Sequence, residues 1–166
     1  MTGQAVYFEE EQSFSPCWFW LTLGASLLVL LAAFGPAYLA GQPAPVEAMA
    51  VSAGVVALMQ LLVAALLFGM KLRVAVDGER LHVRFTPFVD RSISLAEIRS
   101  WEPRTYQPIV EYGGWGIRYG LFGKGQAYNT RGNRGVQLEL NDGSRLLIGS
   151  QRAEELAQAI TQARGR

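Results

Sequence analysis

The stretch CWFWLTLGASLLVLLAAFGPAYLA, residues 17–40, contains no charged residue, and AMAVSAGVVALMQLLVAALLFGM, residues 48–70, has the same character. An α-helix rises about 1.5 Å per residue, so about 20 apolar residues cross the hydrocarbon core of a bilayer. A helix buried in a soluble protein rarely stays apolar on every face over such a length. The sequence therefore predicts two membrane-spanning helices, at residues 17–40 and 48–70.

The connection between these helices, GQPAPVE at residues 41–47, is short, and its two prolines do not continue a helix. The helices are therefore expected to be antiparallel neighbours, a membrane hairpin over residues 17–70. A cleaved signal peptide needs a basic start and a shorter apolar run. Because the first helix follows the acidic residues Glu9–Glu11, we expect it to be retained.

The charge distribution predicts how the hairpin is oriented. All 15 Lys and Arg residues lie from Lys71 onward, and the connection at residues 41–47 has none. Basic residues near helix ends favour the cytoplasmic side. We therefore expect an integral protein of the bacterial inner membrane, with a cytoplasmic N-terminal segment at 1–16 and a cytoplasmic domain at 71–166.

Composition limits the class of protein. Half of the residues are hydrophobic and only 17% are charged, below the quarter that is typical of soluble domains. This excludes a soluble enzyme with a single core, and it also excludes a disordered chain. The predicted spans contain no Asp, Lys, Arg or His, the usual groups of a proton relay or an ion-coupled transport pathway.

Small residues in the second span are candidates for helix contact inside the membrane. Gly54 and Ala57 belong to a series of small residues at close spacing, which permits helices to approach each other. Alanine is also simply common in membrane helices, and both explanations stay open. An amide in hydrocarbon needs a partner, so Gln60 is expected to face the other helix or another subunit.

From Lys71 onward the pattern changes to strands. Apolar and polar residues alternate in 72–76 and 81–85 around the turn dipeptide Asp77-Gly78, which indicates a β-hairpin. A second hairpin is expected around residues 141–144, Asn-Asp-Gly-Ser. The chain closes with an apolar stripe at helical spacing, at positions 153, 156, 157, 160 and 163. These patterns predict an α+β domain of about seven antiparallel strands followed by one covering helix.

This arrangement resembles the bacterial pleckstrin-homology-like domain, which often follows one or two membrane helices. The similar segments are Leu72–Val76, Leu81–Phe85, Ile93–Ile98 and LLIGSQRAEELAQAI at residues 146–160. The resemblance implies an antiparallel β-barrel or sandwich capped by its C-terminal helix, and a binding or assembly module without catalytic activity. Related domains often bind phosphoinositides at a basic first hairpin loop. Here that loop, Asp77–Arg80, has two acids and one base, which disfavours phosphate binding.

The segment rich in glycine and aromatic residues is the candidate binding site. Glycines at this density mark either bulges in a bent sheet, with Trp115 in the core, or a surface that another molecule approaches closely. Tyr, Trp and Arg are the residue types enriched at binding hot spots. The candidate partner- or ligand-binding residues are Tyr112, Gly113, Gly114, Trp115, Gly116, Arg118, Tyr128 and Asn129.

Residues suited to catalysis or metal binding are few. With one histidine, His82, and one cysteine, Cys17, a zinc site lacks its ligands, and we expect no metal, no cofactor and no catalytic residues. Carboxylates gathered from Glu97, Glu102 and Glu111 would indicate an enzyme instead. The tethered domain has only a modest excess of basic residues, which disfavours nucleic acid.

Two roles follow from these expectations. The first is a scaffold that recruits or regulates a partner protein at the membrane. The second is a homo-oligomeric structural or accessory subunit that assembles through the helix hairpin. Membrane lipid is an expected contact in both.

Overall fold

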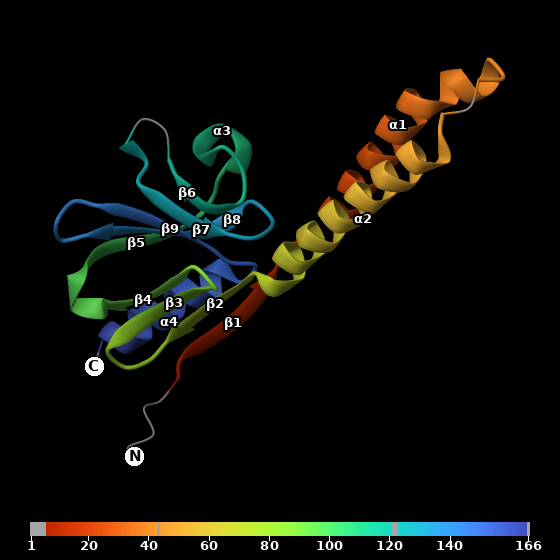
Figure 1. Ribbon diagram of the computed structural model, residues 1–166. Helices are drawn as coiled ribbons and strands as arrows, with labels where there is room; N and C mark the ends of the chain where they lie inside the picture. Colours follow the sequence, from red (N-terminus) through yellow and green to blue (C-terminus); the bar gives the residue numbers. More distant parts are fainter. Residues whose placement is uncertain (1–5, 43, 121–122, 166) are drawn as a thin grey trace. The chain divides into compact units, whose positions relative to one another are not determined.

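The computed structural model describes residues 6–42, 44–120 and 123–165, and it divides into two compact units (Figure 1). One unit, here called the helical unit, comprises residues 14–69. The other, the sheet unit, combines residues from before the helices with those from Met70 onward. Residues 1–5 and 166, which the sequence assigns to the N-terminal segment and the soluble domain, lie outside the described residues.

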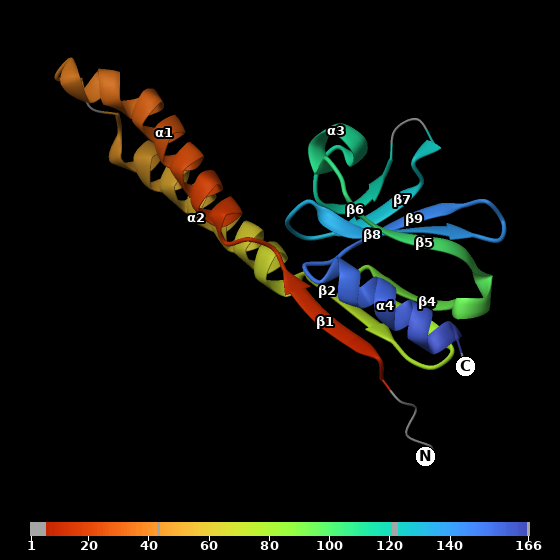
Figure 2. The ribbon, with the colours of Figure 1, turned by 180° about the vertical axis from the view of Figure 1, so that it is seen from behind.

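The helical unit consists of α1 (Cys17–Leu39) and α2 (Val46–Gly69), which lie side by side (Figures 1 and 2). Both helices are long and apolar enough to cross a membrane, and neither buries a residue within the chain. Glu47, in the first turn of α2, is the single charged residue of the two helices. The two apolar helices expected from the sequence are therefore present, with bounds close to the predicted ones.

The first sheet, sheet A, is antiparallel with the order β1-β2-β3-β4. Its strands are β1 (Phe8–Ser13), β2 (Lys71–Val76), β3 (Arg80–Thr86) and β4 (Val89–Ser94). Strands β2 and β3 are the hairpin that the alternation of residues 72–76 and 81–85 predicts. Strand β1 was not predicted, and it pairs with β2 over its full length. The segment that precedes the helices is therefore an edge strand of the sheet that follows them.

The second sheet, sheet B, has the order β5-β8-β9-β7-β6. Its strands are β5 (Ile98–Thr105), β6 (Gly116–Tyr119), β7 (Gln126–Asn129), β8 (Arg134–Leu140) and β9 (Arg145–Gly149). Two short helical turns flank β5, the 3₁₀ turn η1 (Leu95–Glu97) before it and α3 (Pro108–Tyr112) after it. Strand β5, which contains Pro103, lies at an edge, where the loss of one ladder donor is tolerated.

The architecture is α+β, as expected, but it differs from the predicted barrel in three ways. The described residues form nine strands rather than about seven, and these strands make two open sheets. Strands β7 and β9 are parallel. The parallel pair arises because β8 reverses the chain after β7, and the β8–β9 hairpin reverses it again before β9 takes its place beside β7.

The core of the sheet unit lies between the inner faces of the two sheets and α4 (Ala153–Arg164). Helix α4 contacts β1 and β2 of sheet A and β5 and β8 of sheet B (Figure 2). Its buried face is the apolar stripe that the sequence predicts, with Leu156 and Ile160 fully buried. Alternate residues of the strands supply the rest, including Leu72, Val74, Val83, Phe85, Val136, Leu138 and Ile148.

Candidate functional site

The glycines of the predicted binding segment have a conformational role. Gly113 ends α3 in the left-handed conformation with φ 71°, and Gly114 and Gly116 have φ 125° and φ 116°. Side chains disfavour these backbone angles, whereas glycine adopts them readily. The glycines therefore allow the chain to leave α3 and enter β6 within a few residues.

Trp115 and Arg118 are the predicted residues whose side chains reach the surface of this segment. The indole Nε1 of the half-buried Trp115 donates to the Gly132 carbonyl at 2.9 Å. The exposed Arg118 donates from Nε to the Trp115 carbonyl at 3.0 Å. The Trp115 side chain is thus attached to the loop between β7 and β8, and the Arg118 side chain to the residue that precedes β6.

Tyr112, Tyr128 and Asn129 are buried, and internal hydrogen bonds occupy them. The Asn129 amide accepts from the Gly116 N–H at 2.8 Å and donates to the Tyr106 hydroxyl at 3.0 Å. The Tyr128 hydroxyl donates to Gln126 Oε1 at 3.1 Å. These residues hold β6 and β7 in place and present little surface to a partner.

The candidate helix-contact residues separate into two groups. Gln60 Nε2 donates to Ser26 Oγ of α1 at 2.9 Å, and Gln60 Oε1 accepts from Thr22 Oγ1 at 3.4 Å. The amide in the middle of α2 therefore has its partners on the neighbouring helix. Gly54 and Ala57 are exposed, and no atom lies within 4 Å of a Cβ built on Gly54.

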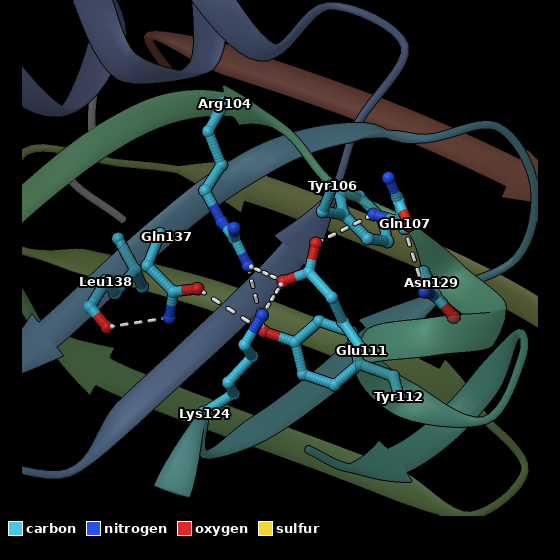
Figure 3. Close-up of polar contacts among 9 residues, drawn as sticks. All are labelled: Arg104, Tyr106, Gln107, Glu111, Tyr112, Lys124, Asn129, Gln137 and Leu138. Carbon is cyan, nitrogen blue, oxygen red and sulfur yellow. Dashed lines mark hydrogen bonds and ion pairs between the residues drawn. The ribbon is translucent and has the colours of Figure 1, made fainter. Parts of the chain in front are cut away.

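A network of charged and polar side chains centres on Glu111 in α3 (Figure 3). Glu111 Oε2 accepts from Arg104 Nη2 and from Lys124 Nζ, both at 2.8 Å. Its other oxygen accepts from the Gln107 backbone N–H at 2.8 Å, one of the amides that the start of a helix leaves without an internal partner. The carboxylate thus connects β5, α3 and the segment around Lys124 that leads into β7.

The environment of Glu111 keeps its carboxyl ionised. Its side chain is only 12% exposed, and this burial alone would raise its pKa. The hydrogen bonds from Lys124, Gln107 and Arg104 outweigh burial and lower the pKa from 4.5 to about 2. Glu111 is therefore a fixed negative charge at neutral pH.

Two tyrosines form the floor beside this network. The Tyr112 hydroxyl accepts from Arg104 Nη2 at 3.3 Å and donates to Gln137 Oε1 at 3.4 Å. Tyr106 and Tyr112 meet edge to face with ring centroids 5.9 Å apart, and both rest on Ala127 and Leu147. Burial raises the pKa of Tyr106 to about 12. This apolar cluster supports the network from beneath.

A polar pocket of about 290 Å³ opens beside the network, on the face of sheet B that carries Gln137. Its lining residues are Ser100, Glu102, Arg104, Lys124, Gln137, Glu139 and Arg145. The strand register aligns Ser100 with Glu139 and Glu139 with Arg145, and it pairs Glu102 with Gln137. The pocket walls therefore carry charges of both signs on three adjacent strands. We call this feature the charged pocket.

Two charged groups of this pocket are available to a ligand. Glu102 and Arg145 are exposed and form no ion pair with any residue that the structure describes. By contrast, Arg104 and Lys124 share Glu111, and Glu139 lies 3.7 Å from Arg99. Arg104 Nε is buried without a hydrogen-bond partner in the described part of the chain.

Sequence reasoning identified Tyr112 as a binding candidate and considered Glu102 and Glu111 only as part of a possible catalytic set, but it did not place basic residues beside them. A signal was present in β5, where Ser100, Glu102 and Arg104 alternate with Trp101 and Pro103 and so share one face. Nothing in the sequence placed Lys124 or Arg145 beside them, because strands distant along the chain bring these residues together. Glu102 lines the charged pocket, Glu111 is held in ion pairs at its side, and Glu97 is not among its lining residues. The three carboxylates considered as a catalytic set thus do not gather there.

No family model matches the chain, and a search of curated proteins likewise finds no significant match.

Proposed function

We propose that this chain is a membrane-anchored, non-enzymatic binding module that recruits or regulates a partner protein at the bacterial inner membrane. The observation that carries the proposal is the charged pocket, which presents Glu102 on β5 and Arg145 on β9, two strands of one sheet that are separated by β8. Charged groups held on regular strands keep a fixed spacing, which favours selective recognition. A polar segment of a partner with one acidic and one basic side chain suits this pair.

The chemistry of the pocket supports binding rather than proton transfer. An acid or base catalyst works best with a pKa near the working pH. The pKa values of two groups in this region are displaced away from neutrality. The pKa of Glu111 is lowered to about 2, and the pKa of Tyr106 is raised to about 12.

The location is proposed from α1, α2 and the charges that follow them. The length and composition of the helices support a membrane anchor. The confinement of Lys and Arg to the residues from Lys71 onward supports a cytoplasmic sheet unit. The β2–β3 hairpin and the C-terminal helix support the pleckstrin-homology-like resemblance.

Affinity purification from solubilised membranes tests the proposal. We expect Glu102→Ala combined with Arg145→Ala to reduce recovery of a specific partner about tenfold or more, since truncating a central contact costs about 1–2 kcal/mol. The matched control is Glu79→Ala with Arg80→Ala, which removes the same charges from the exposed end of the β2–β3 hairpin, where Arg80 begins β3. A third variant, Trp115→Ala with Arg118→Ala, tests the surface predicted from sequence.

The outcomes separate these surfaces. Loss of the partner in the pocket variant alone supports the charged pocket. Loss only in the Trp115 and Arg118 variant transfers the proposed site to the surface beside β6. Equal recovery of the same partners by all four proteins contradicts both.

The exposure of Gly54 and Ala57 favours a second candidate, a homo-oligomeric structural or accessory subunit. Small residues on the outer face of α2 allow a helix of another copy to approach closely. In a Cys17→Ser background, Gly54→Cys would then form a disulfide-linked dimer in mild detergent, where sizing shows one discrete oligomer. A monomer without crosslinks excludes this assembly.

A further inference from the structure

We propose that the turn between β3 and β4, residues 86–89, is a second membrane contact, which inserts Phe88 into the headgroup region of the bilayer that holds the helices. The inference rests on the proposed membrane anchor. It adds to that anchor a contact made by the sheet unit itself.

The turn lies at the end of sheet A where the chain enters and leaves the helices. In the strand register, Ser13 pairs with Lys71 and Lys71 pairs with Thr86. The last residue of β1, the first of β2 and the last of β3 therefore share one end of the sheet. Phe88 follows directly in the turn, where its backbone N–H donates to the Phe85 carbonyl at 2.8 Å.

The short connection keeps this end of the sheet close to the end of α2. Only Met70 separates the end of α2 at Gly69 from the start of β2 at Lys71. Successive Cα atoms are about 3.8 Å apart, so Lys71 lies within about 8 Å of the helix end. Paired residues on adjacent strands are about 5 Å apart, which leaves Thr86 within about 13 Å of that end.

The helix end itself belongs to the headgroup region. The 24 residues of α2 span about 36 Å, more than the hydrocarbon core of about 30 Å. Aromatic side chains cluster at this end, where the rings of Phe19 and Phe68 are 6.3 Å apart, and tryptophan is one of the residue types enriched at the membrane interface. Trp18 and Trp20 lie in the same turn region of α1.

Phe88 has the chemistry of an interfacial anchor. It is 59% exposed, although phenylalanine is usually buried, and Pro87 and the half-buried Val89 flank it. The nearby charges are largely compensated, because Arg84 pairs with Asp90 at 2.9 Å and Glu11 is shared by Lys71 and Arg73, which leaves a net charge of +1 among these five groups. The contact should therefore depend on burial of the ring and change little with the charge of the lipid.

The opposite end of the same strands offers a matched control. Glu79 lies in the exposed β2–β3 turn, and the six residues of β2 separate the two ends by about 20 Å. Its charged side chain has no reason to enter lipid. A probe at residue 79 should report water while a probe at residue 88 reports the interface.

The experiment uses the full chain with Cys17→Ser, reconstituted in nanodiscs of neutral lipid and again with anionic lipid. A nitroxide spin label is attached at Phe88→Cys or at Glu79→Cys. Collision rates with oxygen, which concentrates in lipid, and with a water-soluble nickel chelate then report depth. We expect the nickel collision rate at residue 88 to be at least about threefold lower than at residue 79, and similar in both lipids.

A label at residue 88 that is as accessible to nickel as the label at residue 79 overturns the inference. Protection that appears only when other membrane proteins are added also overturns it, and assigns Phe88 to a protein partner. Failure of the proposed anchor is distinguishable, since the chain would then not incorporate into nanodiscs. Correct incorporation with an aqueous label at residue 88 rejects the second contact alone.

Discussion

At the scale of single residues, Glu111 determines how the charged pocket is held together. Its carboxylate receives three hydrogen bonds, from Arg104, Lys124 and the Gln107 N–H. Removing its charge leaves two cations close together without their shared partner. We expect Glu111→Gln to lower the free energy of unfolding by about 2 kcal/mol, a value reduced to allow for screening of the half-exposed Lys124. Thermal unfolding in detergent, followed by near-UV circular dichroism, measures this loss.

The effect of Glu111→Gln should depend on pH. Because the folded-state pKa of Glu111 is lowered to about 2 from 4.5, its contribution is complete above about pH 5 and disappears as the pH falls towards 2. The wild type and the variant should thus converge in stability over that range. Glu79→Gln, on an exposed turn, should match the wild type within about 0.5 kcal/mol at neutral pH. A difference between wild type and Glu111→Gln that persists at pH 2 would contradict the role assigned to the charge.

At the scale of elements, β1 joins the sheet unit through buried polar groups. Glu10 accepts from the Ser150 hydroxyl at 2.5 Å and from the Gln151 N–H at 3.0 Å, just before α4. The buried Gln12 donates to the Gly149 carbonyl at 2.9 Å and accepts from the Thr130 hydroxyl at 3.3 Å. These contacts connect the start of the chain to β9 and to the segment that leads into α4.

We expect Glu10→Ala to destabilise the sheet unit by about 1–2 kcal/mol, because it leaves the Ser150 hydroxyl and the Gln151 N–H without their acceptor. Hydrogen exchange should show faster exchange of the Gln151 amide, by about tenfold for each 1.4 kcal/mol lost. The adjacent Glu9→Ala is the control, since the Glu9 side chain points outward on the same strand. Equal effects of the two substitutions would show that overall charge, rather than this contact, is responsible.

The elements differ in how far the sequence could predict them. The β2–β3 hairpin and α4 follow from local alternation and helical spacing, and both are present where expected. Strand β1 lacks such a signal because two of its inward positions are Glu10 and Gln12, whose burial depends on partners more than a hundred residues away. The charged pocket could not be predicted for the same reason, because its residues come from distant parts of the chain. In addition, α3 is only five residues long and Lys124 belongs to no strand, so neither has a clear local pattern.

At the scale of the whole molecule, the chain inserts its two helices between paired strands. Three residues separate the end of β1 from α1 and one residue separates the end of α2 from β2, while Ser13 and Lys71 face each other. A fragment of residues 71–166 would therefore lose an edge strand that buries Phe8, worth about 1.5–3 kcal/mol for the ring alone. We expect this fragment to aggregate, or to unfold at least about 10 °C below a protein in which an Asn-Gly turn joins residues 6–13 to 71–166. Size-exclusion chromatography and thermal unfolding of the two soluble proteins make the comparison.

The joined protein with Phe8→Ser serves as a control, because it keeps the added strand but loses the buried ring. Its stability should fall between that of the fragment and that of the joined protein. If residues 71–166 alone are monomeric and as stable as the joined protein, β1 is dispensable, and the sheet unit does not need the segment that precedes the helices.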